Sequence, residues 1–139
     1  MDKEQELRNY MMLIEQYKEQ MAQLETQNQY VQAAIAEYNR AKITLEQLNN
    51  ADGGDEILIP IGGSAFVDAK VKSTSKVLFD IGGGLVTEKK SEDAIKNIDK
   101  RIEELQKTQE KLGDMLQNFQ NETNDAYAKA QKLMQEQQK

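Results

Sequence analysis

The chain contains no cysteine and no histidine, and it has a single proline. Without cysteine it can form no disulfide and carry no thiolate nucleophile, and without histidine it has no imidazole base. The residues that most often bind zinc are missing for the same reason. We therefore expect a protein that is not an enzyme and that needs neither a metal nor another cofactor.

The charge balance is acidic, with 18 Lys and Arg against 24 Asp and Glu and a formal net charge of -6. Nucleic-acid affinity comes mainly from clustered Lys and Arg, so nucleic acid is not expected as a partner. No apolar run approaches the roughly 18 residues of a membrane span, and residues 1–9 lack the apolar stretch of a secretory signal. We expect a soluble cytoplasmic protein without a membrane partner.

Glycine is also scarce outside the middle of the chain. Seven of the eight glycines and the only proline lie between residues 53 and 84, and Gly113 is the exception. The flanks should therefore form long helices. This distribution predicts one domain in three parts: a coiled-coil helix over residues 1–50, a β module over 51–90 and a second coiled-coil helix over 91–139.

Both flanks carry a heptad repeat with an apolar seam. The a and d positions of the first flank are Leu7, Tyr10, Ile14, Tyr17, Met21, Leu24, Asn28, Val31, Ile35, Tyr38, Lys42, Leu45 and Asn49. Those of the second are Ile95, Ile98, Ile102, Leu105, Gln109, Leu112, Leu116, Phe119, Thr123, Ala126, Ala130, Leu133 and Gln137. Polar residues at a few a positions help to fix register. The matched lengths favour an antiparallel hairpin of two helices.

Four short apolar or β-branched runs lie between the helices, at residues 56–60, 65–72, 76–81 and 85–88. The separators Gly62-Gly63-Ser64 and Gly82-Gly83-Gly84 can adopt the positive φ angles of tight hairpin turns. These features predict two β-hairpins in series. The predicted fold class is therefore α+β, a long antiparallel coiled-coil hairpin with two β-hairpins inserted between its helices.

The predicted strands carry more large apolar side chains than one chain is expected to cover. A coiled coil buries only its seam, and an isolated hairpin is marginally stable in water. We expect these side chains to form an oligomerisation module, most simply a β-barrel shared between subunits. They are Ile57, Leu58, Ile59, Phe66, Val67, Val77, Leu78, Phe79 and Ile81.

An antiparallel hairpin brings the two chain ends together at a tip, built from residues 1–17 and 127–139. Met11, Met12 and Leu13 lie at e, f and g positions there, outside the a and d seam, and Tyr127 and Met134 lie at e positions of the second helix. Exposed apolar patches commonly mark interaction sites, and methionine adapts to varied partners. Chance excess at a fraying end, or packing against another arm, would also account for these residues.

The whole chain resembles the archaeal-type alpha class of the prefoldin family. The resemblance lies in a long helix at each end and in the segments EILIPIGGSAFVDAKV, TSKVLFDIGGGLVTEK and SEDAIKNIDKRIEEL between and after them. Its specific part is the middle, because two hairpins rather than one mark the alpha class.

The resemblance implies an ATP-independent chaperone that holds unfolded polypeptides and passes them to a group II chaperonin. It implies a hexamer of two alpha and four beta subunits with a double β-barrel and six projecting arms. The client-binding residues expected at the arm tip are Leu7, Tyr10, Met11, Met12, Leu13, Ile14, Tyr127, Leu133 and Met134. The alternative is a coiled-coil scaffold that forms homo-oligomers or filaments and binds no client.

Overall fold

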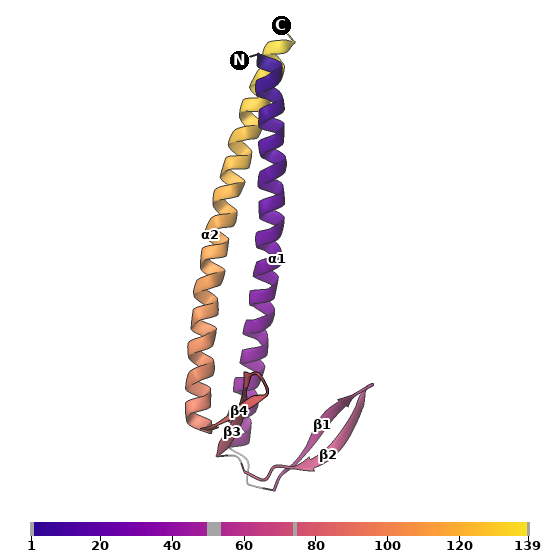
Figure 1. The fold of residues 1–139 in the computed structure, drawn as a ribbon, viewed down its shortest axis with the longest axis vertical. Helices are drawn as coiled ribbons and strands as arrows, with labels where there is room; N and C mark the ends of the chain where they lie inside the picture. Colours follow the sequence, from indigo (N-terminus) through magenta and orange to yellow (C-terminus); the bar gives the residue numbers. More distant parts are fainter. Residues whose placement is uncertain (1, 50–53, 74, 139) are drawn as a thin grey trace. The chain divides into compact units, whose positions relative to one another are not determined.

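The computed structural model describes residues 2–49, 54–73 and 75–138. Helix α1 spans Lys3–Asn49 and helix α2 spans Ser91–Gln137, and each has 47 residues. Four strands lie between them in the sequence (Figure 1). The two predicted helices are confirmed, and Gly113 does not interrupt α2. The predicted boundary between residues 50 and 51 lies outside the described residues.

The predicted heptad register is confirmed by burial. Every a and d side chain that the structure describes in α1 is buried or partly buried, and the same holds in α2 with the exception of Gln137. Ile14, Leu24 and Leu45 are the most deeply buried seam residues of α1. The seam is narrow, as expected of a pair of helices that bury only one stripe each.

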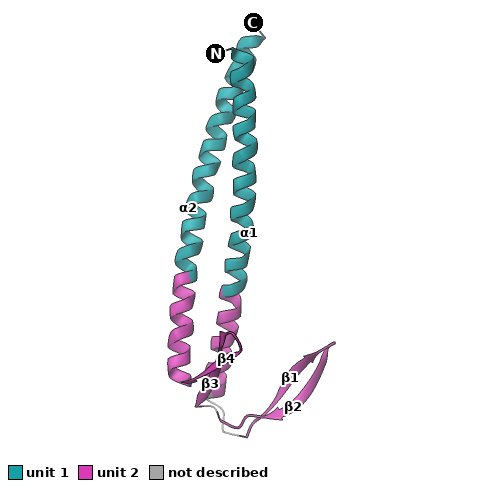
Figure 2. Cartoon of the chain, viewed as in Figure 1, with its two compact units in different colours: residues 1–34, 105–139 teal, residues 35–104 magenta. Residues whose placement is uncertain are grey.

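The chain divides into two compact units (Figure 2). Unit 1 combines residues 1–34 with 105–139, and unit 2 comprises residues 35–104. In unit 1, Lys3 Nζ lies 3.3 Å from Glu136 Oε2, so the start of α1 lies beside the end of α2. In unit 2, Lys42 Nζ lies 2.7 Å from Asp99 Oδ1, so the end of α1 lies beside the start of α2. The helices are antiparallel in each unit.

The middle of the chain forms two separate antiparallel hairpins, as predicted. Strand β1 (Glu56–Gly62) pairs with β2 (Ala65–Lys70), and β3 (Lys76–Gly82) pairs with β4 (Leu85–Lys90). The strands differ slightly from the predicted runs. Strand β2 ends at Lys70 rather than at residue 72, and β4 continues to Lys90, where α2 follows directly.

The two hairpins repeat each other at an interval of 20 residues. Glu56 pairs with Lys70 and Lys76 with Lys90, and each hairpin has a one-residue register shift just before its turn. The two central turn residues are Gly63 and Ser64 in the first hairpin and Gly83 and Gly84 in the second. All of them have positive φ, as a type I′ turn requires. At the second of these positions the first hairpin has Ser64, with φ of 61°, and the second has Gly84, with φ of 77°.

Among the residues that the structure describes, side chains of the second hairpin pack against the helix core of unit 2, and none of the first hairpin belongs to that core. Leu45, Ala94, Ile98 and Ile102 form the buried core of unit 2, with Val77 and Phe79 packed against it among other partly buried side chains. Val77 and Phe79, two of the side chains expected to need cover from another subunit, are therefore partly covered by their own chain. The physical reason is the connection, because β4 leads directly into α2 and the Ser91 N–H donates to the Ser75 carbonyl at 3.0 Å.

Candidate functional site

The first candidate site is the end of unit 1 that holds the start of α1 and the end of α2, called here the arm end. It comprises residues 2–17 and 127–138, which are the predicted tip without Met1 and Lys139, two residues outside the described part. The ion pair between Lys3 and Glu136 holds its outermost turns together. Lys129 and Asp125 pair at 3.0 Å on α2 nearby.

The seam residues predicted to bind clients are buried or partly buried within the arm end. Ile14 is 1% exposed, and the small residues Ala126 and Ala130 in the seam of α2 are also buried. Leu7, Tyr10 and Leu133 are partly buried. These side chains could meet a client only if the helices separate, and their assignment as client-binding residues stays a prediction.

The remaining predicted residues form the exposed apolar part of the arm end. Met11 is 48% exposed and Met12 62%, while on α2 Tyr127 is 40% exposed and Met134 48%. Leu13 differs, because it is partly buried rather than fully uncovered. Its g position borders the seam, where the flank of a coiled coil is partly covered. Four exposed side chains from the two helices therefore provide an apolar surface that the helix pair itself does not cover.

A cation borders this apolar surface. Lys18 Nζ lies 5.4 Å from the centre of the Tyr127 ring. The side-chain interaction with Tyr127 raises the pKa of Lys18 above its ordinary value. A cation over an aromatic face is attracted by the ring and restrains its orientation. Tyr127 thus has a charged neighbour over its ring while 40% of its surface remains exposed.

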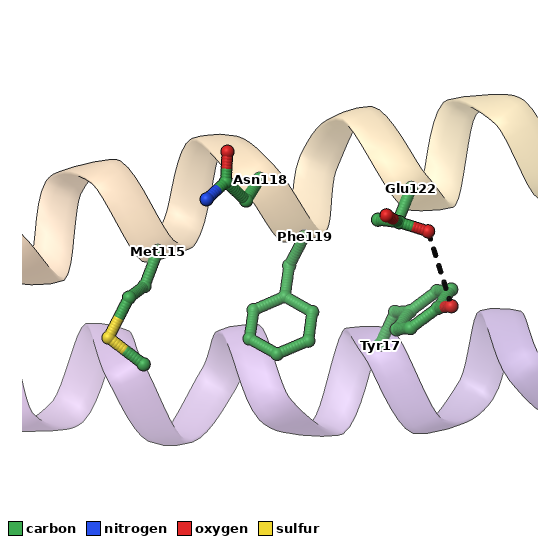
Figure 3. Close-up of a pocket in the computed structure, with 5 residues that line it drawn as sticks. All are labelled: Tyr17, Met115, Asn118, Phe119 and Glu122. Carbon is green, nitrogen blue, oxygen red and sulfur yellow. Dashed lines mark hydrogen bonds between the residues drawn. The ribbon is translucent and has the colours of Figure 1, made fainter.

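A shallow hollow further along unit 1 was not predicted. Figure 3 shows Tyr17 beside Phe119, with ring centres 5.8 Å apart, and the Tyr17 hydroxyl 3.5 Å from Glu122 Oε2. Met115 lines the same hollow, which has a volume of about 420 Å³, and is 45% exposed. The heptad repeat offered one signal for this hollow. Met115 lies at a g position, and an apolar residue at a g position lies outside the seam.

The second candidate site is the strand surface, defined as the exposed apolar side chains of β1 to β4 in unit 2. Most residues predicted for oligomerisation belong to it, with exposed fractions between 38% for Ile57 and 68% for Leu78. They are Ile57, Leu58, Ile59, Phe66, Val67, Leu78 and Ile81. The prediction missed Ile61, Leu85 and Val86, which flank the two turns and are at least 60% exposed. Val77 and Phe79 are partly covered by the chain itself.

The faces of the first hairpin are apolar and open. Ile57 pairs with Ala69 and Ile59 with Val67, so one face carries four aliphatic residues in two cross-strand pairs. Leu58 and Phe66 lie on the opposite face and are 63% and 58% exposed. Exposed apolar patches of this kind mark protein interaction sites.

Other kinds of site find no support in the described part of the chain. Within residues 2–49, 54–73 and 75–138 no group of three metal-ligating side chains is close enough to hold a metal ion. Among the same residues no helix is both long and apolar enough to cross a membrane.

Comparisons with known proteins agree on one family. The family model described as prefoldin subunit matches residues 17–136. A prefoldin subunit alpha from Methanococcoides burtonii is 35% identical over 116 residues, which cover 81% of this chain and 82% of the relative. One from Archaeoglobus fulgidus is 30% identical over 136 residues, covering 98% and 94%. A solved structure of a filamentous PFD from Methanocaldococcus jannaschii matches with a TM-score of 0.61 at 25% identity, covering 92% of this chain and 98% of that one.

Proposed function

The chain belongs to the prefoldin family, and on this premise we propose that it is the alpha subunit of a chaperone that holds unfolded proteins without ATP. In the proposed complex two such chains combine with four beta subunits. The arm ends hold unfolded polypeptides, and the complex passes them to a group II chaperonin in the cytoplasm. The relatives named prefoldin subunit alpha support the chaperone class and the choice of subunit.

The observation that carries the proposal is the uncovered first hairpin. Residues 56–62 of β1 are exposed throughout, and in β2 only Ala69 is partly buried. A large apolar side chain contributes about 1.5 to 3 kcal/mol when it becomes fully buried. Several of them together can exceed the roughly 4 to 15 kcal/mol that association costs in lost freedom. Partner subunits that complete a barrel around these strands would supply that burial.

The arm end supports client holding through its exposed apolar side chains. Met11, Met12, Tyr127 and Met134 belong to neither seam, so the fold of the arm does not require them to be apolar. Methionine is flexible and polarizable, which suits it to clients of different shape. Clients bound there would be unfolded segments with exposed apolar residues.

Replacing both exposed methionines tests this assignment. The double change Met11→Gln and Met12→Gln keeps good helix formers and removes apolar surface. We expect about fivefold more chaperone to be needed to suppress aggregation of a chemically unfolded probe protein, because two apolar contacts are lost. The matched control is Tyr30→Gln with Ile43→Gln, two residues that are 75% and 54% exposed elsewhere on α1. An equal loss in the control, or none in the test variant, would contradict client holding at the arm end.

The filamentous neighbour gives a reason to keep a second function, a homo-oligomeric scaffold. The same strand surface could join copies of this chain in an open series. The mass of the purified chain, alone and mixed with a prefoldin beta subunit, separates the two. A defined complex that forms only on mixing supports the chaperone subunit, and large assemblies of the chain alone support the scaffold.

A further inference from the structure

Charge is distributed unevenly around the last six turns of α2. All of its charged side chains between residues 117 and 138 occupy c and g positions of the heptad: Glu122, Asp125, Lys129, Lys132 and Glu136. The ten residues at b, e and f positions from Gln117 to Gln138 carry no charge. We call these ten residues the amide stripe, because seven are Gln or Asn, and all ten are exposed.

The first half of the same helix has no such stripe. Of the nine b, e and f positions from residue 96 to 114, seven are charged: Lys96, Asp99, Lys100, Glu103, Lys107, Glu110 and Asp114. A solvated helix surface is normally mixed in this way. The loss of charge is therefore confined to one face and to the part of α2 that belongs to unit 1.

Four of the seven amides of the stripe form hydrogen-bonded pairs along the helix. Gln117 Nε2 donates to Asn121 Oδ1 at 3.0 Å, and Gln120 Nε2 donates to Asn124 Oδ1 at the same distance. Each primary amide offers two donor hydrogens and two acceptor lone pairs, so one such bond leaves most of its capacity for a ligand. Tyr127 at the middle of the stripe and Met134 near its end add apolar surface.

Covering an uncharged face costs less than covering a charged one. Burial of a carboxylate or ammonium without a partner is far more costly than burial of an amide that gains a hydrogen bond. The centres of protein interfaces are depleted in charged residues and enriched in tyrosine and methionine. The amide stripe has this composition, and the charged c and g face of the same turns does not.

The chemistry of the stripe indicates what covers it. A partner helix satisfies its backbone groups internally and would require a regular apolar row, whereas the stripe has only two large apolar residues. An extended polypeptide presents an unpaired N–H and C=O at nearly every residue, which primary amides can match. The stripe is about 32 Å long at 1.5 Å per residue, the length of about ten extended residues.

We propose that the amide stripe binds an extended, uncharged segment of an unfolded polypeptide, with its backbone hydrogen-bonded to the Gln and Asn side chains and its apolar residues on Tyr127 and Met134. This inference rests on the proposed function, and it extends the client site from the arm end along one face of α2.

The test compares charged versions of the stripe with a matched control. The full chain, assembled with a prefoldin beta subunit, carries Gln117→Glu, Gln120→Glu and Gln131→Glu in one variant and the same three positions changed to Lys in another. The control variant carries Gln20→Glu, Gln23→Glu and Gln27→Glu, three exposed glutamines on α1 in the same unit. The probe is a fluorescent peptide of about ten uncharged residues, built from Ser, Asn and Gln with one Phe and one Leu. Circular dichroism and mass verify helix content and assembly.

We expect both stripe variants to bind the peptide about tenfold more weakly than the unchanged complex, because either charge must be desolvated. The α1 control should keep its affinity. Opposite effects of Glu and Lys would show simple attraction of charge and overturn the proposal, as would unchanged binding in both stripe variants or an equal loss in the control.

Two outcomes distinguish this inference from the proposed function. If the unchanged complex fails to bind unfolded probes at all, client holding itself is wrong. If it binds them and loses affinity only through Met11→Gln with Met12→Gln, the arm end holds clients and the amide stripe does not. A further peptide set, with Gln replaced by Glu or by Lys, should bind the unchanged complex more weakly than the neutral peptide.

Discussion

The two β-hairpins share register, turn geometry and apolar pattern, yet among the described residues the helix core of unit 2 covers side chains of the second hairpin and none of the first. Val77 and Phe79 of β3 pack against the helix core of unit 2, whereas Ile57 and Ile59, twenty residues earlier, remain 38% and 44% exposed. The difference comes from the connection, since β4 leads directly into α2. Equivalent sequences therefore have different surroundings: one hairpin adds to the core of unit 2, and we propose that a partner covers the other.

The largest expected effect comes from placing charge on the open face of the first hairpin. Ile57→Asp with Ile59→Asp should weaken association with the beta subunit by about 4 kcal/mol or more, because two apolar burials are lost and two carboxylates must be desolvated. The helix content of the isolated chain should not change. Light scattering of the mixture measures the first result and circular dichroism the second. Normal assembly of this variant would show that the first hairpin is not the interface.

A smaller effect should separate the two hairpins within the isolated chain. Phe79→Ala should lower the free energy of unfolding by about 2 kcal/mol, since a partly buried aromatic side chain leaves the core of unit 2. Ile59→Ala, the equivalent position, should lower it by less than about 0.5 kcal/mol, as at other exposed sites. Urea unfolding followed by circular dichroism provides both values. Equal losses would mean that the first hairpin is also packed against its own chain.

The smallest expected effect concerns the turns. Ser64 and Gly84 occupy the same turn position with positive φ, and a residue with a Cβ atom is strained there. A Cβ atom at Gly84 would meet nothing within 4 Å, so Gly84→Ser should cost about 1 kcal/mol from backbone conformation alone. Ser64→Gly should stabilise the first hairpin by about 0.5 kcal/mol or more. Amide exchange in each hairpin, measured by NMR, would reveal these changes. Unchanged exchange in both variants would refute the comparison of the turns.

Much of this architecture could be predicted from the sequence. The heptad spacing determined which face of each helix is buried, and the glycine-rich turns located both hairpins. The docking of the second hairpin could not be predicted from its pattern, because Ile57 and Ile59 show the same alternation as Val77 and Phe79. The docking depends on the direct junction of β4 and α2 at Lys90 and Ser91, which the apolar pattern of the strands does not encode.

The candidate sites were predicted less completely. The exposure of Met11, Met12, Tyr127 and Met134 followed from their heptad positions, but the partial burial of Leu13 depends on the opposite helix. Ile61, Leu85 and Val86 were missed, although Leu85 and Val86 belong to the apolar run predicted over residues 85–88.

Amide hydrogen exchange across the two hairpins tests the central claim most directly. In the isolated chain the account predicts rapid exchange in Glu56–Gly62 and Ala65–Lys70, with slower exchange in Lys76–Gly82 and Leu85–Lys90. Addition of the beta subunit should slow exchange in the first hairpin strongly and in the second much less. Strong protection of the first hairpin in the dilute isolated chain, or no change in it on assembly, would contradict the account.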